Sequence, residues 1–214
     1  MGLIIISPIF LLFIFLIFLY DFHNPFYVAP RIGKNGKLFK MIKLRSMKIN
    51  ADKTGVASTA NDDDRITPIG KLIRKFKFDE LSQLLNVFIG NMSLVGPRPQ
   101  IEKDVKLYTE KEMGLLKVSP GITDFSSIIF SDEGDILEGS SNPDKDYNIL
   151  IRPWKSRLGL FYIKHQTVFV DFKLIFLTIL SFINKKFVLI IISNYLQEKN
   201  AQKELVLLSL RNKE

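Results

Sequence analysis

The sequence predicts an α+β fold that is mainly helical and lies at a membrane. One observation behind this is an uncharged apolar run over residues 3–20. Another is a pair of apolar-rich stretches, Phe26–Ile32 and Leu38–Leu44, separated by a turn sequence. Further along, apolar residues alternate with basic residues in the way that is typical of helices on a membrane surface. With 214 residues, the chain has room for one catalytic domain plus membrane elements.

The apolar run at residues 3–20 contains a helix-breaking pair, Ser7-Pro8. Proline lacks an amide hydrogen and its ring clashes with the preceding turn, so we expect a kink there. A cleaved signal peptide is disfavoured, because no basic region precedes the run and no small-residue cleavage site follows it. A simple span and a bent segment that enters and leaves on one face both remain open. The basic residues downstream favour a cytoplasmic catalytic portion in either case.

The two apolar-rich stretches predict a β-hairpin, because Asn35 and Gly36 between them tolerate positive φ. Residues 31–48 contain seven basic residues and no acidic one. The basic residues are Arg31, Lys34, Lys37, Lys40, Lys43, Arg45 and Lys48. Such a surface beside a membrane segment suits anionic headgroups or a diphosphate, although an ordinary solvated hairpin face has the same composition.

Composition narrows the function classes. The formal net charge of +8 indicates an anionic partner. The absence of cysteine excludes disulfides, thiolate zinc sites and cysteine nucleophiles. With only two histidines, a metal would be held by oxygen, which favours magnesium or a relative. Nucleic acid is not an expected partner, since the basic residues alternate with Phe and Leu and no nucleic-acid-binding signature is present.

Two adjacent carboxylates, Asp79 and Glu80, stand at the start of an apolar-periodic stretch that we expect to be a helix ending near Gly90. Neighbouring helical residues point about 100° apart, so the pair can divide labour but cannot share one proton. Amide hydrogens at a helix N-terminus would favour carboxylates and phosphates there. The alternative is that Asp79 caps the helix and Glu80 lies in its first turn.

Basic elements flank this pair on both sides. Before it, residues 70–78 form a basic amphipathic stretch that includes Arg74. After it, Pro97 and Pro99 bracket Arg98 and stiffen its backbone, which suits a guanidinium that grips phosphate oxygens. The acidic run at residues 62–64 is more typical of a solvated loop than of a cation site.

Several ordered motifs give the chain a family resemblance over residues 7–185. They are Lys43-Leu44-Arg45-Ser46-Met47, Arg65-Ile66-Thr67-Pro68-Ile69-Gly70, Asp79-Glu80-Leu81-Ser82-Gln83-Leu84-Leu85-Asn86-Val87, Met92-Ser93-Leu94-Val95-Gly96-Pro97-Arg98-Pro99 and Pro120-Gly121-Ile122-Thr123. With these motifs the sequence resembles the bacterial sugar transferases, the monotopic polyprenyl-phosphate phosphoglycosyl transferases that initiate lipid-linked glycan assembly.

The resemblance implies a fold and a location. Family members carry a re-entrant membrane helix broken at a Ser-Pro pair, which Ser7-Pro8 matches, together with a catalytic domain and interfacial helices on the cytoplasmic face of the bacterial inner membrane. It therefore implies a monotopic protein in contact with anionic phospholipid. The expected organisation is a re-entrant helix at residues 1–23, a catalytic domain at 24–186 and a helical tail at 187–214. A homo-oligomer is left open.

The resemblance also implies a reaction. Asp79 would attack the sugar-bearing phosphate of a UDP-sugar, release UMP and form a phosphosugar-aspartate. Undecaprenyl phosphate would then take the phosphosugar, which starts exopolysaccharide, capsule or lipopolysaccharide synthesis. Glu80 would help to hold Mg²⁺, and Arg98 with its prolines would grip phosphate.

Lys43, Arg45 and Arg74 match basic positions around that site. After Thr123, however, the chain departs from the family pattern, so the identity of the sugar does not carry over. The alternative function is a catalytically degenerate, basic adaptor at the membrane surface, in which the carboxylates are caps and the arginines contact lipid.

Two features of the C-terminal part point to the membrane surface. Trp154 has Arg152, Lys155 and Arg157 around it, which suits an interfacial anchor or nucleotide stacking, although a buried Trp with solvated neighbours fits equally well. The apolar stretches at residues 171–183 and 187–192 are short, and such lengths are typical of interfacial helices.

Overall fold

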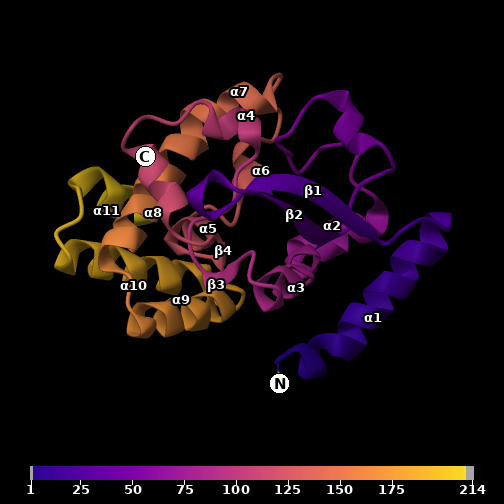
Figure 1. The fold of residues 1–214 in the computed structure, drawn as a ribbon, viewed down its shortest axis with the longest axis horizontal. Coiled ribbons are helices and arrows are strands. Elements are labelled where there is room, and N and C mark those ends of the chain that lie inside the picture. Colours follow the sequence, from indigo (N-terminus) through magenta and orange to yellow (C-terminus); the bar gives the residue numbers. More distant parts are fainter. Residues whose placement is uncertain (1, 211–214) are drawn as a thin grey trace.

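The computed structural model describes residues 2–210, with side chains from residue 7 onward. Residue 1 of the predicted membrane segment and residues 211–214 of the predicted tail lie outside the described residues. The fold is α+β and mainly helical, as predicted (Figure 1). The helices are α1 (Gly2–Asp21), α2 (Pro68–Lys75), α3 (Gln83–Phe88), α4 (Glu102–Val105), α5 (Phe125–Ile129), α6 (Glu133–Ile136), α7 (Pro143–Asp146), α8 (Arg152–His165), α9 (Val168–Ser181), α10 (Lys185–Glu198) and α11 (Lys203–Leu210). The strands are β1 (Phe26–Ile32), β2 (Leu38–Leu44), β3 (Ser93–Val95) and β4 (Gly121–Thr123).

The hairpin prediction is confirmed with the expected bounds. Strands β1 and β2 pair antiparallel, from Phe26 opposite Leu44 to Ile32 opposite Leu38. Between them, Asn35 and Gly36 adopt positive φ of 57° and 74°, the conformation that Asn-Gly tolerates. In Figure 1 the hairpin lies between α1 and the helical body, so its β2 strand can face both.

Helix α1 packs on the hairpin and on α2 through one side only. Phe13 and Ile17 are buried against Leu44 and Ile73. Leu11 and Phe15, on other sides of the helix, are more than half exposed. The helix continues through Pro8 without ending, and the re-entrant path with its break at Ser7-Pro8 stays a prediction. Within residues 2–210, no helix has both the length and the apolar character that a membrane span requires.

The main apolar core lies among α5, α8, α9 and α10, which Figure 1 shows gathered on the side away from α1. Ile128, Leu158, Leu174 and Ile192, one from each of these helices, are fully buried in it. Helix α10, which includes the start of the predicted helical tail, contributes to the same core as the helices before it.

Helix α9 turns a phenylalanine-rich side outward. Phe169, Phe172 and Phe176 are between 63% and 79% exposed, while Leu174 and Leu177 on the other side are buried. A contiguous apolar surface of this kind is typical of a membrane or protein contact.

Candidate active site

Asp79 and Glu80 lie in a tight turn, Phe78–Glu80, between α2 and α3. The expectation that they open the helix is wrong by four residues, because α3 begins at Gln83. The Leu81 amide donates to the Phe78 carbonyl, three residues back, so the chain closes a 3₁₀ turn here. Neither carboxylate caps α3, since the residue before it is Ser82 and its side chain makes no capping bond.

Two buried polar side chains hold this turn against strand β2. Ser82 Oγ donates to the Ile42 carbonyl at 3.0 Å. Asn86 bridges two backbone groups of the strand: its Oδ1 accepts from the Ile42 amide at 2.9 Å and its Nδ2 donates to the Lys40 carbonyl at 2.7 Å. The side-chain amide of Asn86 thus supplies the hydrogen bonds that a neighbouring strand would give to these backbone groups. It places the Asp79 turn beside Lys43, the next residue of β2.

Lys43 and Asp79 form the first ion pair of the site, with Nζ 3.6 Å from Oδ2. Within the described chain, no hydrogen-bond donor reaches the Asp79 carboxylate, and Lys43 is its one cationic neighbour within 4 Å. Burial lowers the pKa of Lys43, and the charges of Arg98 and Arg74 act in the same direction, while Asp79 and Glu80 oppose them. The Asp79 oxygens therefore lie beside a positive charge without being tied to it by a short bond.

Glu80 and Arg98 form the second pair, and here the bond is a two-pronged fork. Arg98 Nη2 donates to Oε1 at 2.6 Å and Nη1 donates to Oε2 at 3.1 Å. Burial alone would raise the pKa of Glu80, but the charges of Arg98, Lys43 and Lys77 outweigh it and hold that pKa well below its usual range. Glu80 is thus a carboxylate at all ordinary pH values, and its orientation is set by the planar guanidinium.

Glycines and prolines position the Arg98 loop, which follows β3. The Gly96 amide donates to the Thr123 carbonyl at 2.9 Å, and the Gly121 amide donates to the Pro97 carbonyl at 3.0 Å. A Cβ on Gly121 would come within 2.1 Å of the Gly96 nitrogen, so this approach requires glycine. Pro97, Arg98 and Pro99 also line a small pocket. We call Lys43, Asp79, Glu80 and Arg98 together the active-site cluster.

Arg45, two residues beyond Lys43, does not join the active-site cluster. Its Nη1 and Nη2 donate to the two carboxylate oxygens of Asp21 at 2.5 and 2.6 Å, and its Nε donates to the Asn24 carbonyl at 2.8 Å. The Arg45 hydrogen bond lowers the pKa of Asp21. We call Asp21 and Arg45 the α1 junction, because they tie the end of α1 to the end of β2.

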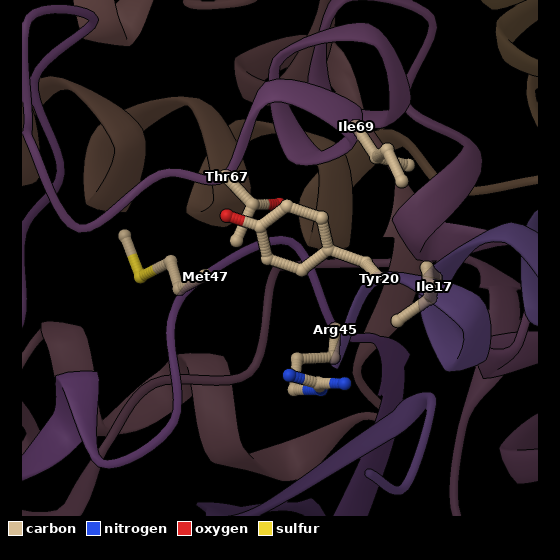
Figure 2. A pocket seen from close by; sticks show the side chains of 6 residues that line it. All are labelled: Ile17, Tyr20, Arg45, Met47, Thr67 and Ile69. Atoms are coloured by element: carbon tan, nitrogen blue, oxygen red, sulfur yellow. The ribbon is translucent and has the colours of Figure 1, made fainter. Parts of the chain in front are cut away.

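A small, shallow pocket adjoins the α1 junction (Figure 2). Figure 2 shows the Tyr20 ring reaching from α1 across this pocket toward Thr67, with the Arg45 side chain on another side of it. Arg45 therefore contributes to the wall between α1 and the hairpin.

The remaining predicted residues divide between the site and the loops. Arg74, on α2, makes no ion pair with any described carboxylate, and its charge acts on Lys43. In the acidic run, Asp63 pairs with Arg65 at 2.6 Å and Asp62 accepts from the Gly139 amide. Across the described residues, no three His, Cys, Asp or Glu side chains are grouped as a metal site would need.

Sequence reasoning missed three residues next to the cluster. Lys155 and Glu133 form a short ion pair whose charges act on Arg98 and Lys77. The signal for Lys155 was its place in the basic run around Trp154, but nothing in the sequence pairs it with Glu133. Gln83 is fully buried, and neither polar atom of its side chain has a hydrogen-bond partner in the described structure.

Comparison with known proteins connects this arrangement to a family. The model of the family described as "Bacterial sugar transferase" matches residues 1–185. A putative undecaprenyl-phosphate N-acetylgalactosaminyl 1-phosphate transferase of Bacillus subtilis is 48% identical over 99 residues, which are 46% of this chain and 55% of that protein. The exopolysaccharide production protein ExoY of Sinorhizobium fredii is 38% identical over 138 residues, 58% of this chain and 61% of ExoY.

Another relative matches more of this chain, but the match covers a smaller share of that relative. The UDP-glucose:undecaprenyl-phosphate glucose-1-phosphate transferase of Escherichia coli is 34% identical over 160 residues, 72% of this chain and 32% of that protein. The chain thus spans between about a third and three fifths of the length of these relatives. The family match covers the hairpin, the active-site cluster and helices through α9. The chain belongs to the bacterial sugar transferase family.

Proposed function

We propose that the protein transfers a sugar 1-phosphate from a UDP-sugar to undecaprenyl phosphate, with Asp79 as the nucleophile. The names of the relatives support the acceptor and the type of transfer. The observation that carries the assignment to Asp79 is the contrast within the carboxylate pair. Glu80 is held by both prongs of Arg98, whereas the Asp79 carboxylate accepts no hydrogen bond from the described residues. An oxygen that must form a bond to phosphorus needs such freedom.

The reaction proceeds in two displacements. An Asp79 carboxylate oxygen attacks the sugar-bearing phosphorus, and the bond from that phosphorus to the bridging oxygen breaks, so UMP leaves with the electron pair. An oxygen of undecaprenyl phosphate then attacks the same phosphorus, and the bond to Asp79 breaks and restores the carboxylate. Two steps suit the substrates, because a soluble nucleotide sugar and a lipid need not occupy the site together.

The cations of the active-site cluster would stabilise the transferring group. Charge on the phosphoryl oxygens is the main feature that such enzymes must offset. Lys43 lies beside Asp79. Arg98 is paired with Glu80, the residue that follows Asp79 in the turn. Positioned charges at this place act without the reorganisation that water would require.

Magnesium is part of the proposal, with Glu80 as a residue that would hold it. Mg²⁺ binds through one or two carboxylates plus substrate phosphate oxygens and water. Asp79 and Glu80 offer such a carboxylate pair, and each Glu80 oxygen keeps a further lone pair beside its bond to Arg98. When bound, the ion would supply positive charge to the phosphate oxygens. The chain's own residues orient the carboxylates for it.

The location that we propose is the cytoplasmic face of the bacterial inner membrane. The exposed apolar sides of α1 and α9 support contact with lipid, and the net charge of +8 favours anionic phospholipid. A monotopic arrangement with a re-entrant α1 would bring the acceptor's phosphate to the active-site cluster. Exopolysaccharide, capsule or lipopolysaccharide synthesis would begin with this product.

Release of UMP tests the proposed function. Detergent-solubilised protein is incubated with a panel of UDP-sugars, undecaprenyl phosphate and Mg²⁺, and UMP is measured. We expect release with at least one donor and its loss in Asp79→Asn. Asp64→Asn, in the exposed acidic run, is the matched control and should keep full activity. Undiminished release from Asp79→Asn contradicts the assignment, and no release with any donor leaves the membrane adaptor as the better description.

A further inference from the structure

Lys77 lies two residues before Asp79, at the point where α2 has ended and the turn has not begun. It is partly exposed to solvent. Its charge acts on Glu80, and the charges of Arg98 and Lys155 act on it in turn. Lys77 therefore belongs to the same electrostatic neighbourhood as the active-site cluster, although none of the family motifs includes it.

Three other cations in this neighbourhood each have a carboxylate partner. Lys43 pairs with Asp79, Arg98 with Glu80 and Lys155 with Glu133. In residues 2–210, Lys77 makes no ion pair and no side-chain hydrogen bond. Glu80, whose charge acts on Lys77, is already held by both prongs of Arg98. An ammonium group kept among other cations without a counter-charge is costly unless an anion joins it.

The backbone of Lys77 is also unusual. Its φ is 53° and its ψ is 28°, in the left-handed region that glycine and asparagine adopt far more readily than lysine. A residue chosen only for this turn would be one of those two. Strained positions of this kind are concentrated at functional sites, where the side chain has a task that outweighs the strain.

We propose that Lys77 is a substrate-binding residue whose ammonium group contacts phosphate oxygens of the reacting substrate. This rests on the proposed function, and it adds a phosphate ligand to those that the family motifs imply. Both the nucleotide-sugar donor and the lipid acceptor bring phosphate, so the same chemistry could serve either half of the reaction. The donor brings a diphosphate, which offers non-bridging oxygens on two phosphorus atoms where the acceptor has a single phosphate, and we assign the contact to the donor.

The left-handed backbone offers an unusually clean set of variants. Lys77→Gly and Lys77→Asn remove the charge while suiting the backbone. If Lys77 had a purely structural role, both variants would keep full activity and have unchanged or higher thermal stability. Lys77→Arg keeps the charge at the same strained position. Lys75→Ala, on the exposed end of α2, is the matched control for loss of one lysine from the same segment.

Binding is measured first, by calorimetry with UMP and with inorganic diphosphate on solubilised full-length protein. We expect Lys77→Gly and Lys77→Asn to keep the melting temperature but to weaken diphosphate binding by roughly ten- to hundredfold, the usual effect of losing a charged hydrogen bond. Lys77→Arg should restore most of the affinity, and Lys75→Ala should match the wild type. This measurement needs no turnover, so it tests Lys77 even if the proposed reaction fails.

The two half-reactions then identify which phosphate Lys77 contacts. Adduct formation is followed by mass spectrometry after a donor pulse without acceptor, and adduct discharge is followed after undecaprenyl phosphate is added. Slower formation in Lys77→Gly with normal discharge supports the donor. Normal formation with slow discharge overturns that assignment in favour of the acceptor. A stable Lys77→Gly protein within twofold of the wild type in diphosphate binding and in both steps overturns the proposal altogether, whereas a wild-type protein that forms no adduct and releases no UMP contradicts the proposed function instead.

Discussion

Two basic side chains near the end of strand β2 serve different regions of the molecule. Lys43 faces the active-site cluster, and Arg45, two residues later, belongs to the α1 junction. At the junction, Asp21 receives two short bonds from Arg45, and a further donor of Arg45 reaches a backbone carbonyl. In the cluster, Asp79 accepts no hydrogen bond from the described residues and Lys77 nearby lacks a partner.

The difference separates a structural ion pair from a chemical one. At the α1 junction, the donors of Arg45 go to Asp21 and to a backbone carbonyl, so this pair holds two elements together. Charges that remain unsaturated while largely buried are held in readiness for a group that the protein itself does not contain. By this criterion Arg45, which the motif resemblance groups with Lys43, is a structural residue.

Among the variants that test this comparison, we expect the largest loss of stability and activity from a substitution of Arg98. Arg98→Ala removes the fork on Glu80 and leaves a largely buried carboxylate without its main partner, which costs about 3–5 kcal/mol of unfolding free energy. We also expect UMP release to fall by about a hundredfold or more, because a group that stabilises developing charge is lost. Chemical denaturation and an initial-rate assay measure the two effects. Arg98→Lys should recover charge but not the fork, so full activity in that variant would contradict the bidentate role.

A smaller effect is expected at Asn86, which positions the Asp79 turn without reaching the substrate. Asn86→Ala leaves the Ile42 amide and the Lys40 carbonyl unsatisfied, and we expect a loss of about 2 kcal/mol in stability. The rate of UMP release should fall more than the affinity for UMP, since the turn shifts relative to Lys43. Asn91→Ala, at an exposed position nearby, is the control. A normal melting temperature for Asn86→Ala would show that β2 does not depend on this bridge.

At the α1 junction the expected effect is smaller again. Arg45→Ala should cost about 1 kcal/mol, because Asp21 is partly exposed and can be solvated once its partner is gone. The rate of adduct formation with a soluble donor should stay within a few fold of the wild type. A loss as large as that in Arg98→Ala would move Arg45 into the active site and remove the distinction between the two regions.

The smallest effect is expected from pH near neutrality. The pKa of Glu80 is lowered relative to the unfolded chain, so its contribution to stability is present above about pH 4.5, the usual range for Glu, and is lost as pH falls toward the folded value. Between pH 5 and 8 the Glu80–Arg98 pair should therefore give no pH dependence of stability. Below pH 4.5 the stability of the wild type should fall more steeply than that of Glu80→Gln. Parallel acid denaturation curves for the two proteins would contradict an ionised Glu80 in the fold.

Local signals explain which parts of this structure could be predicted from sequence. The hairpin follows from Asn35-Gly36 between two apolar stretches, and the Arg98 loop follows from its two prolines. The start of α3 could not be predicted, because the choice between a helix and a 3₁₀ turn at Asp79 depends on Ser82 and Asn86 bonding to a strand forty residues earlier.

The same reason applies to the site. Arg45 and Lys43 have similar sequence surroundings, and only the arrival of Asp21 from α1 separates their roles. Glu133 and Lys155 lie 22 residues apart, and no periodicity in the sequence predicts that they pair. A single sequence thus does not show which side chains pair in space, whereas turns and apolar patterns can be recognised from neighbouring residues.

Intact-mass spectrometry after a pulse of UDP-sugar tests the central claim most directly. In the absence of undecaprenyl phosphate, the wild-type protein should gain the mass of one sugar phosphate, located by fragmentation to the peptide that contains Asp79, and addition of the acceptor should remove it. Asp79→Asn should gain nothing. A protein that releases UMP only when the acceptor is present and never carries the adduct, or an Asp79→Asn variant that still carries it, would contradict Asp79 as the nucleophile.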